Sequence, residues 1–489
     1  FVSSDEVLNL DASYQGQDVK TVKLKTVKKN QPTTVEITKS DVTTGVELDG
    51  AKLIVLDQEG NVVEQWTSVK DQPHVIKRLT VGEEYTLREE MAPYGYLKAT
   101  DVKFTLEDTA EIQKVEMKDE VPTGLLIINK NGEFLDKVTL LDNVKGTVEH
   151  LFEYVTGSLS DVTFDVFAAE DIKAADGISE DYFKADEKVG TITTDSNGIA
   201  QMGDLPAGKY YVKEVKTAHG YVLDGEPRYV DLSYRDQDTP VITYDEKWQN
   251  ARQKVKVTVL KKEKDTERVL AGGVFGLYTS DDIKNAKGEV LLKKDSLIEQ
   301  RVTDEKGQIT FTADLPVDGK YYVKEITPPT GYLLDEEEHD VDCNYEGDQV
   351  KNIERTAESS ETVVKQPFEV IKVANNGKTD ADLLKGAGFT AYLASSLKVK
   401  EDGSYDFTGA KPVVITEDGK TEMFTDAKGY AKSIPLPYGK YVVRETTTPH
   451  NYKPVDDFVV TISENHPNEP QTWRVLLDDE FHAKLKIIK

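Results

Sequence analysis

The feature of this sequence that most constrains its fold is a long internal repeat. Three stretches superimpose on one another: TDSNGIAQMGDLPAGKYYVKEVKTAHGY (194–221), TDEKGQITFTADLPVDGKYYVKEITPPTGY (303–332) and TDAKGYAKSIPLPYGKYVVRETTTPHNY (425–452). A fourth stretch, VGEEYTLREEMAPYGY (81–96), keeps only the second half of the pattern. Solenoid repeats have periods of about 20–50 residues, and these units are longer. The sequence therefore predicts a chain of domains.

Each unit consists of short alternating runs such as KYYVKEV, bounded by Gly, Pro, Asp and Asn. This pattern is typical of antiparallel strands in a sandwich or barrel. Upstream of each run lies a second strand that starts with small residues: LDGAKLIVLD (48–57), LSDVTFDVFAAED (159–171), LAGGVFGLYTSDD (270–282) and LKGAGFTAYLASS (384–396). We predict an all-β fold of tandem sandwich domains in a linear array.

The two ends of the sequence indicate partial repeats. Residues 1–30 align without a gap to residues 221–250, and the final LKIIK has the spacing of a first strand. The predicted boundaries are 1–30 (last strands of a preceding repeat), 31–121, 122–252 (with an insertion), 253–363, 364–481 and 482–489 (first strand of a following repeat).

Composition excludes several classes of partner. The net charge of −28 repels phosphate backbones and anionic lipids, so we expect neither nucleic-acid binding nor membrane insertion in this segment. The single cysteine, Cys343, excludes intrachain disulfides and is expected to be a packed small residue. The sequence has no transmembrane run, signal peptide or LPxTG motif, so any anchor is expected to lie outside this segment.

A lysine at the end of each repeat's first strand is the first candidate functional residue. In VEITKSD, Val35, Ile37 and Lys39 are spaced two apart and share one face of a strand. A lone strand lysine is usually a solvated edge residue. Here a lysine recurs on the apolar face of the first strand in every repeat, which favours a buried lysine instead. The other members are Lys130, Lys261, Lys372 and the terminal Lys489.

Acidic and amide residues supply two further candidates in each repeat. A glutamate follows the apolar face of the YYVKE strand, at Glu89, Glu214, Glu325 and Glu445. An ion pair with the buried lysine would be sufficient to explain these glutamates. Eleven residues before a lysine lies the last strand of the preceding repeat, with Asp119, Asn250 or Asp478 at that position. The three side chains are expected to meet in one core.

This arrangement resembles the Cna protein B-type, SpaA-like (prealbumin-like) domains of Gram-positive surface proteins. The resemblance is carried by the first-strand lysine before an acidic position (ITKSD, VLKKE), the LAGGVFGLY strand, the TDxxG turn with GKYYVKE, and the P-x-G-Y loop. It implies Ig-like domains that form intramolecular isopeptide bonds. The implied pairs are Lys39–Asp119 with Glu89, Lys130–Asn250 with Glu214, and Lys372–Asp478 with Glu445.

Burial explains how such a bond could form. An apolar core disfavours charge, lowering the lysine pKa towards a neutral nucleophile and raising the glutamate pKa towards a neutral acid. The neutral acid can polarise the Asp or Asn carbonyl and shuttle protons. The reaction needs no metal, cofactor or external enzyme, and we predict that the protein is not an enzyme beyond this single turnover.

The third repeat departs from the pattern. Eleven residues before Lys372 stands Glu361 rather than Asp or Asn, so a bond to Lys261 assisted by Glu325 is in doubt. Asn352, nine residues earlier, is the alternative acceptor if that strand is shifted. Asn30 and Lys489 are half-sites whose partners lie beyond the segment.

The predicted function is structural: a stalk or fibre segment of a pilin or large adhesin at the bacterial cell surface or cell wall, with neighbouring repeats as partners. The alternative is a module that binds a host matrix protein or glycan through the insertions 136–160 and 397–424. An enzyme acting on an external substrate is the third reading, and no site outside the triads supports it. The acidic run 335–340 is interpreted as a solvated loop, with weak calcium binding left open.

Overall fold

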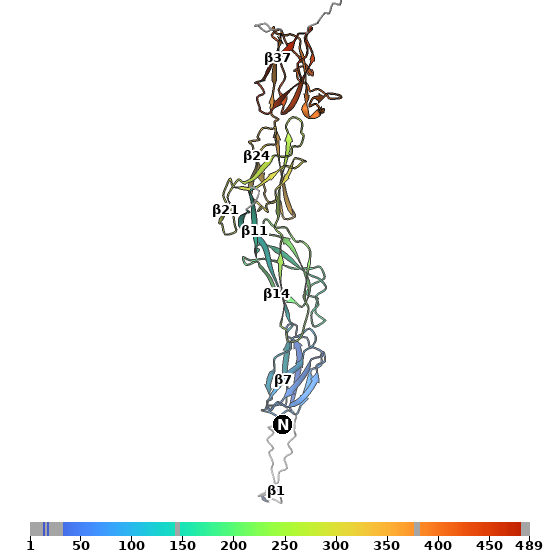
Figure 1. The fold of residues 1–489 in the computed structure, drawn as a ribbon. Helices are drawn as coiled ribbons and strands as arrows, with labels where there is room; N and C mark the ends of the chain where they lie inside the picture. Colours follow the sequence, from blue (N-terminus) through green and yellow to red (C-terminus); the bar gives the residue numbers. More distant parts are fainter. Residues whose placement is uncertain (1–12, 15–16, 19–32, 142–146, 376–381, 481–489) are drawn as a thin grey trace, which may run out of the picture. The chain divides into compact units, whose positions relative to one another are not determined.

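The computed structural model describes residues 13–14, 17–18, 33–141, 147–375 and 382–480. The predicted half-sites Asn30 and Lys489 lie outside the described residues. The chain divides into two compact units, which are described separately: unit 1 contains residues 1–133 and 156–252, and unit 2 contains residues 134–155 and 253–489. Strands β1 (Ser13–Tyr14) and β2 (Gln17–Asp18) form a short antiparallel pair. Figure 1 labels representative strands.

The first domain of unit 1 is a sandwich of a three-stranded and a four-stranded sheet. The smaller sheet has the order β6 (His74–Lys77), β3 (Thr34–Asp41), β9 (Ile112–Asp119). The larger has the order β5 (Val62–Thr67), β4 (Lys52–Leu56), β7 (Glu84–Met91), β8 (Val102–Thr105). Alternating side chains of the two sheets face each other, so Val35, Ile37 and Leu87 are buried in one core.

The second domain repeats this plan within unit 1. Strands β14 (Ile199–Pro206), β10 (Thr123–Leu141) and β17 (Val241–Gln249) form one sheet. The facing sheet has the order β13 (Lys188–Thr193), β12 (Thr163–Ala168), β15 (Gly208–Lys216), β16 (Arg228–Leu232). Strand β10 is 19 residues long, and only its first part belongs to unit 1.

The third domain, in unit 2, has one additional strand. Its smaller sheet has the order β23 (Gln308–Thr310), β18 (Lys254–Glu263), β26 (Asn352–Glu361). Its larger sheet runs β11 (Glu149–Ser158), β22 (Leu297–Val302), β19 (Val274–Thr279), β24 (Lys320–Thr327), β25 (Glu338–Asp342). A hairpin of β20 (Ile283–Lys284) and β21 (Val290–Leu292) lies beside them.

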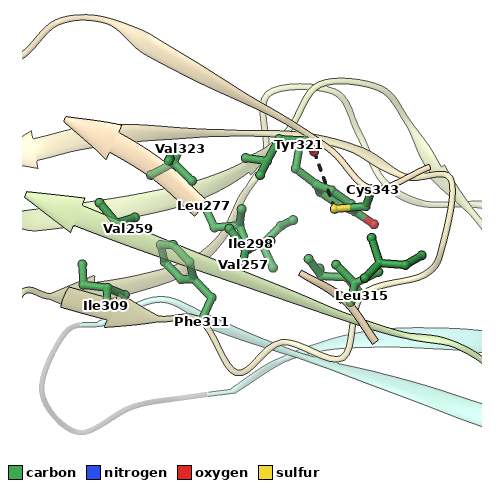
Figure 2. Packing of buried hydrophobic residues seen from close by; sticks show 14 of the residues in the cluster. Val257, Val259, Leu277, Ile298, Ile309, Phe311, Leu315, Tyr321, Val323 and Cys343 are labelled. Atoms are coloured by element: carbon green, nitrogen blue, oxygen red, sulfur yellow. Dashed lines mark hydrogen bonds between the residues drawn. The ribbon is translucent and has the colours of Figure 1, made fainter. Parts of the chain in front are cut away.

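Figure 2 shows the side chains of the third domain's core directed toward one another, with Val257 and Val259 of β18 among them. Cys343 lies in this core with no exposed surface, and burial raises the pKa of its thiol to about 11. Its position agrees with the prediction of a packed small residue.

The fourth domain completes unit 2. Strands β33 (Tyr430–Lys432), β28 (Phe368–Asn375) and β37 (Gln471–Asp479) face the sheet β32 (Glu422–Phe424), β29 (Gly388–Leu393), β35 (Gly439–Thr447), β36 (Phe458–Ile462). Short pairs are formed by β27 (Lys365–Gln366) with β34 (Leu436–Pro437), and by β30 (Lys398–Val399) with β31 (Tyr405–Asp406). A 3-10 turn spans Ala394–Ser396. No helix in the described part of the chain is long and apolar enough to cross a bilayer.

The all-β prediction is confirmed, but the prediction of purely antiparallel strands is wrong in one respect. In every domain the first strand pairs in parallel with the last: β3 with β9, β10 with β17, β18 with β26 and β28 with β37. Parallel neighbours need a long connection, and here the rest of the domain supplies it. Alternation of apolar residues reports which face is buried and contains no information about strand direction.

The insertion of the second repeat also differs from expectation. The sequence assigned it to the domain 122–252, whereas residues 134–155 group with unit 2. Leu135 and Phe152 are part of the third domain's core cluster. The sequence shows that these residues are apolar but not which core they join.

Candidate functional site

A buried lysine lies on the first strand of each of the four domains. The exposed fractions of these residues are 2% for Lys39, 1% for Lys130, and 0% for Lys261 and Lys372. Their apolar neighbours at two-residue spacing, such as Val35 and Ile37, share the core with them. The structure therefore places all four at the inward parity that the sequence indicates.

The backbone of each lysine is fixed from both sides in the last three domains. Its N–H donates to the carbonyl of the TDxxG glycine, as in Lys372 N to Gly429 O at 2.7 Å, and its carbonyl accepts from a leucine, as in Leu384 N to Lys372 O at 2.9 Å. Gly429 has φ +69°, and a Cβ there would lie 2.4 Å from the Lys372 carbonyl oxygen. Only glycine fits this contact, which explains the end of the TDxxG motif.

In the first domain the structure brings together the predicted triad. Lys39 Nζ contacts Asp119 Oδ1 and lies 3.1 Å from Glu89 Oε1, and the side chains of all three are at most 1% exposed. Asp119 on β9 pairs with Asp41 on β3, and Asp41 lies two residues beyond Lys39 on the same strand. The long lysine side chain spans this offset.

The fourth domain has the same arrangement. Lys372 Nζ contacts Asp478 Oδ1 and lies 2.8 Å from Glu445 Oε2, with no exposed side-chain surface on any of them. Asp478 pairs with Ala374, again two residues beyond the lysine. The amine and the carboxyl carbon are therefore held together by the first and last strands of the domain.

In the second domain the glutamate lies between the other two groups. Glu214 Oε2 is 2.7 Å from Lys130 Nζ, and Glu214 Oε1 accepts a hydrogen bond from Asn250 Nδ2 at 2.5 Å. Asn250 Nδ2 also donates to Thr217 Oγ1 at 2.7 Å. Asn250 is 1% exposed, so this polar cluster is sequestered from water.

The third domain contains a different set of partners. Lys261 Nζ lies 2.9 Å from Glu361 Oε1 and 3.2 Å from Glu325 Oε1, and it donates to Ser359 Oγ at 2.7 Å. Of these three oxygens, Ser359 Oγ accepts a hydrogen bond from the amine, and the two glutamate oxygens lie within ion-pair distance of it. Ser359 Oγ in turn donates to Asp335 Oδ2, which lies 3.1 Å from His339 Nε2.

The alternative acceptor in this domain is not supported. Asn352 is exposed and pairs with Lys254 at the beginning of the two strands, whereas Lys261 pairs with Ser359. Strand β26 is not shifted, so Glu361 occupies the position beside the lysine and Asn352 does not.

Burial shifts the pKa of one lysine and of three groups at the acceptor position. Burial lowers the pKa of Lys130. It raises the pKa of Asp119 to about 7 and that of Asp478 to about 6, against the attraction of the neighbouring lysine. In the third domain, burial followed by the adjacent Glu325 raises the pKa of Glu361 to about 8. A neutral carboxyl group loses water more readily than a carboxylate on attack by an amine.

Several supporting residues were not identified from the sequence. A phenylalanine opposite the glutamate places its ring under the lysine amine in three domains, at 5.5 Å for Phe164, 5.2 Å for Phe275 and 5.8 Å for Phe389. The first domain has Leu53 at this register. The recurring aromatic in VTFDVF, GVFGLY and AGFTAY was the available signal.

A backbone N–H also fixes the glutamate in three domains. The donor lies ten residues later in each case: Ala99 N to Glu89 at 2.7 Å, Asp335 N to Glu325 at 3.0 Å, and Val455 N to Glu445 at 3.0 Å. The P-x-G-Y loop follows the glutamate strand and leads into these donors. The loop thus positions the carboxyl group beside the lysine.

Three ligand-type side chains of the acidic run 335–340 converge. Asp335, Glu337 and His339 have ligand atoms within 4.8 Å of one another and could hold a metal ion. The Asp335 carboxylate is already engaged by Ser359 and by the ring of His339. These contacts are sufficient to explain the cluster as a hydrogen-bonded loop.

Comparison with known proteins identifies the domain family. The model of the SpaA prealbumin-like fold domain matches residues 33–121, 153–248, 255–357 and 367–474. The chain belongs to this family. The collagen adhesin of Staphylococcus aureus is 28% identical to it over 273 residues, which cover 50% of this chain and 21% of that protein. The chain thus spans about a fifth of the length of this relative.

The chain is also similar to solved structures. The TIE protein of Bacillus anthracis has a TM-score of 0.50 and 20% identity, over 91% of this chain and 74% of that chain. The major pilin subunit of Bacillus cereus has a TM-score of 0.26 and 16% identity, over 73% of this chain and all of that chain (100%).

Proposed function

We propose that this chain is a stalk segment of a Gram-positive surface pilin or adhesin, stabilised by autocatalytic isopeptide bonds in its first, second and fourth domains. The proposed bonds are Lys39–Asp119, Lys130–Asn250 and Lys372–Asp478. The family membership and the named relatives support a structural role at the cell surface. The observation that carries the cross-links is a buried lysine in contact with an aspartate carboxyl group in the first and fourth domains. In the second domain Glu214 contacts both Lys130 and Asn250.

The chemistry is balanced without any added reagent. The neutral lysine Nζ attacks Cγ of the acceptor, a new N–C bond forms, and the C–O or C–N bond to the leaving group breaks. The neutral amine gives up one proton and keeps the other as the amide N–H. The lost proton leaves with the hydroxyl of a protonated Asp as water, or with the amide nitrogen of Asn as ammonia. Glu89, Glu214 and Glu445 are the proton shuttles, since each lies beside its lysine.

The expected contribution to stability is large. Lys39 and Asp119 are 80 residues apart, and Lys372 and Asp478 are 106 apart. The loop-entropy model gives about 4–5 kcal/mol for closing loops of this size. Typical domains have free energies of unfolding of about 5–15 kcal/mol, so one such bond is a substantial fraction of the total.

Mass spectrometry of the purified chain tests the proposal directly. We expect an intact mass lower than the sequence mass by two waters and one ammonia. Peptide mapping should recover the three pairs as branched peptides and Lys261 as a free lysine. An intact mass equal to the sequence mass would refute the cross-links and leave a string of uncross-linked β-domains.

Ligand binding is the second candidate function, because the chain is similar to a protein named as a collagen adhesin. Most of the insertion 136–160 groups with unit 2, where Phe152 packs in the core of the third domain. The insertion 397–424 has exposed apolar residues such as Val399 and Val414. A binding screen on immobilised matrix proteins and glycans, with the chain and a variant shortened within 398–411, tests this function. Binding that is lost on shortening would support it, and no binding by the intact chain would refute it.

A further inference from the structure

The third domain contains a hairpin that the chain supplies from an earlier point in its sequence. Residues 134–155 include the end of β10 and most of β11, and they are separated from the rest of the third domain by about a hundred residues of unit 1. Strand β11 extends the sheet β22-β19-β24-β25 at its β22 edge. The other three domains have four strands in the corresponding sheet.

The hairpin contributes to the core as well as to the sheet. Leu135 and Phe152 are 8% and 4% exposed and belong to the same cluster as Val257 and Ile298. The ribbons of β10 and β11, drawn in pale teal, pass beside this cluster in Figure 2. By contrast, Leu151 is 46% exposed. Strand β11 therefore has one docked and one solvated face, as an added edge strand should.

Hydrogen bonds fix the register of the added strand. Gln300 N donates to Val148 O at 3.0 Å, and a ring nitrogen of His150 lies 3.1 Å from Ile298 O. Tyr154 Oη donates to Asp314 O at 2.8 Å. The first two contacts occupy polar backbone groups of β22 that would otherwise form an open sheet edge.

An arginine of β22 offsets the like charges that the hairpin brings to this edge. Glu149 stands directly opposite Glu299, and two like charges in this position repel. Arg301 lies near both, with Nε 2.5 Å from Glu299 Oε1 and Nη2 3.5 Å from Glu149 Oε1. Glu299 has no exposed surface and also accepts from Thr312 N at 2.8 Å.

We propose that the paired strand segments 134–141 and 147–155 are a donated hairpin that stabilises the third domain in place of a covalent cross-link. The third domain is the one with Glu361 at the acceptor position and a lysine in contact with two glutamates and Ser359. Donation of the hairpin stands on the packing alone, whereas its role as a substitute for a bond rests on the proposed function. The hairpin then acts as a structural element of the third domain and is not free to present a ligand surface.

Hydrogen–deuterium exchange of the full chain tests this inference. Phe152→Asp places a charge in the core, and we expect exchange in peptides covering 254–263 and 297–302 to accelerate by at least about tenfold. Leu151→Asp, the exposed neighbour, is the matched control and should change exchange by less than about twofold. Phe152→Ala provides a milder version if the first variant does not purify.

The outcomes separate this inference from the proposed function. Faster exchange throughout the third domain supports donation, whereas faster exchange confined to the hairpin would overturn it. Intact mass on the same samples reports the cross-links of the other domains independently. If the exchange result holds and the mass shows no cross-links, the hairpin still belongs to the third domain but replaces no bond.

Discussion

Lys261 Nζ lies 2.9 Å from Glu361 Oε1, at the register where the other domains place an aspartate or asparagine beside the lysine. Glu361 pairs with Glu263, two residues beyond Lys261, just as Asp119 pairs with Asp41 two residues beyond Lys39. One additional methylene and the hydroxyl of Ser359 distinguish this site. The same fold thus places two glutamates and a serine around the lysine in one domain and candidate reactive pairs in the others.

Shortening the acid should convert the third domain into a cross-linked one. In Glu361→Asp the carboxyl carbon occupies the acceptor position of the first and fourth domains, so we expect the intact mass to fall by one further water. Peptide mapping should then join Lys261 to residue 361. Glu361→Gln, which keeps the original length, is the control, and an unchanged mass in the aspartate variant would contradict the prediction.

The third domain should lose stability as the pH rises. An unfolded glutamate has a pKa of about 4.3, whereas the pKa of Glu361 is raised to about 8 in the folded state. The folded state therefore binds more protons between these values, and its stabilising contribution, complete below the lower pKa, is lost by the upper one. Denaturant unfolding followed by exchange of β18 peptides measures this.

The test of the pH dependence replaces the buried titratable group, Glu361, by an amide of the same length. Glu361→Gln should flatten the fall in stability of the third domain between about pH 5 and about pH 8. Glu358→Gln, on the same strand but exposed, should leave it unchanged. An equal slope in the two variants would show that the titration belongs to other groups.

Removing a shuttle glutamate should prevent the matching bond. In Glu89→Ala the carboxyl group that would move protons between Lys39 and Asp119 is gone. The deficit between the intact mass and the variant's own sequence mass should therefore be one water smaller than in the unmodified chain. The neighbouring Glu90 is exposed on the same strand, and Glu90→Ala is the matched control. A mass deficit that survives Glu89→Ala would refute the catalytic assignment.

The glycine of the TDxxG turn should be far less tolerant than other glycines of similar conformation. Gly429→Ala adds a Cβ against the Lys372 carbonyl, whereas Gly419 has φ +79° with nothing within 4 Å of its Cβ position. The backbone penalty alone is about 1–2 kcal/mol, and we expect it for Gly419→Ala. Gly429→Ala should cost more and should slow cross-linking of the fourth domain after refolding. Equal denaturation midpoints would contradict this interpretation of the turn.

Much of the candidate site was predictable because it depends on which face of a strand each side chain occupies. Lys39 and Glu89 were placed inward from two-residue spacing alone, and the structure buries both. Repetition across four domains made this signal stronger than any single strand could provide. Asp119 and Asp478 were found by their constant distance from the next lysine, which works because the linker between domains has a constant length.

The remaining features depend on contacts that the sequence does not encode locally. Ser359 and Asp335 lie 24 residues apart, and only the pairing of β18 with β26 brings Ser359 to the lysine. The destination of Phe152 depends on which core offers a matching surface. The raised pKa values of the acceptor aspartates were also not predicted, because they depend on how deeply Asp119 and Asp478 are buried between the sheets.

The parallel pairing of first and last strands has a consequence for a chain under tension. In the first domain Thr34, at the start of β3, lies beside Ile112, at the start of β9, so the chain enters at one end of this strand pair and leaves at the other. Pulling on the two ends slides the strands past each other, and the hydrogen bonds between them resist together in shear. If the same two strands were antiparallel, pulling on the ends would break their hydrogen bonds one after another, starting at one end of the pair.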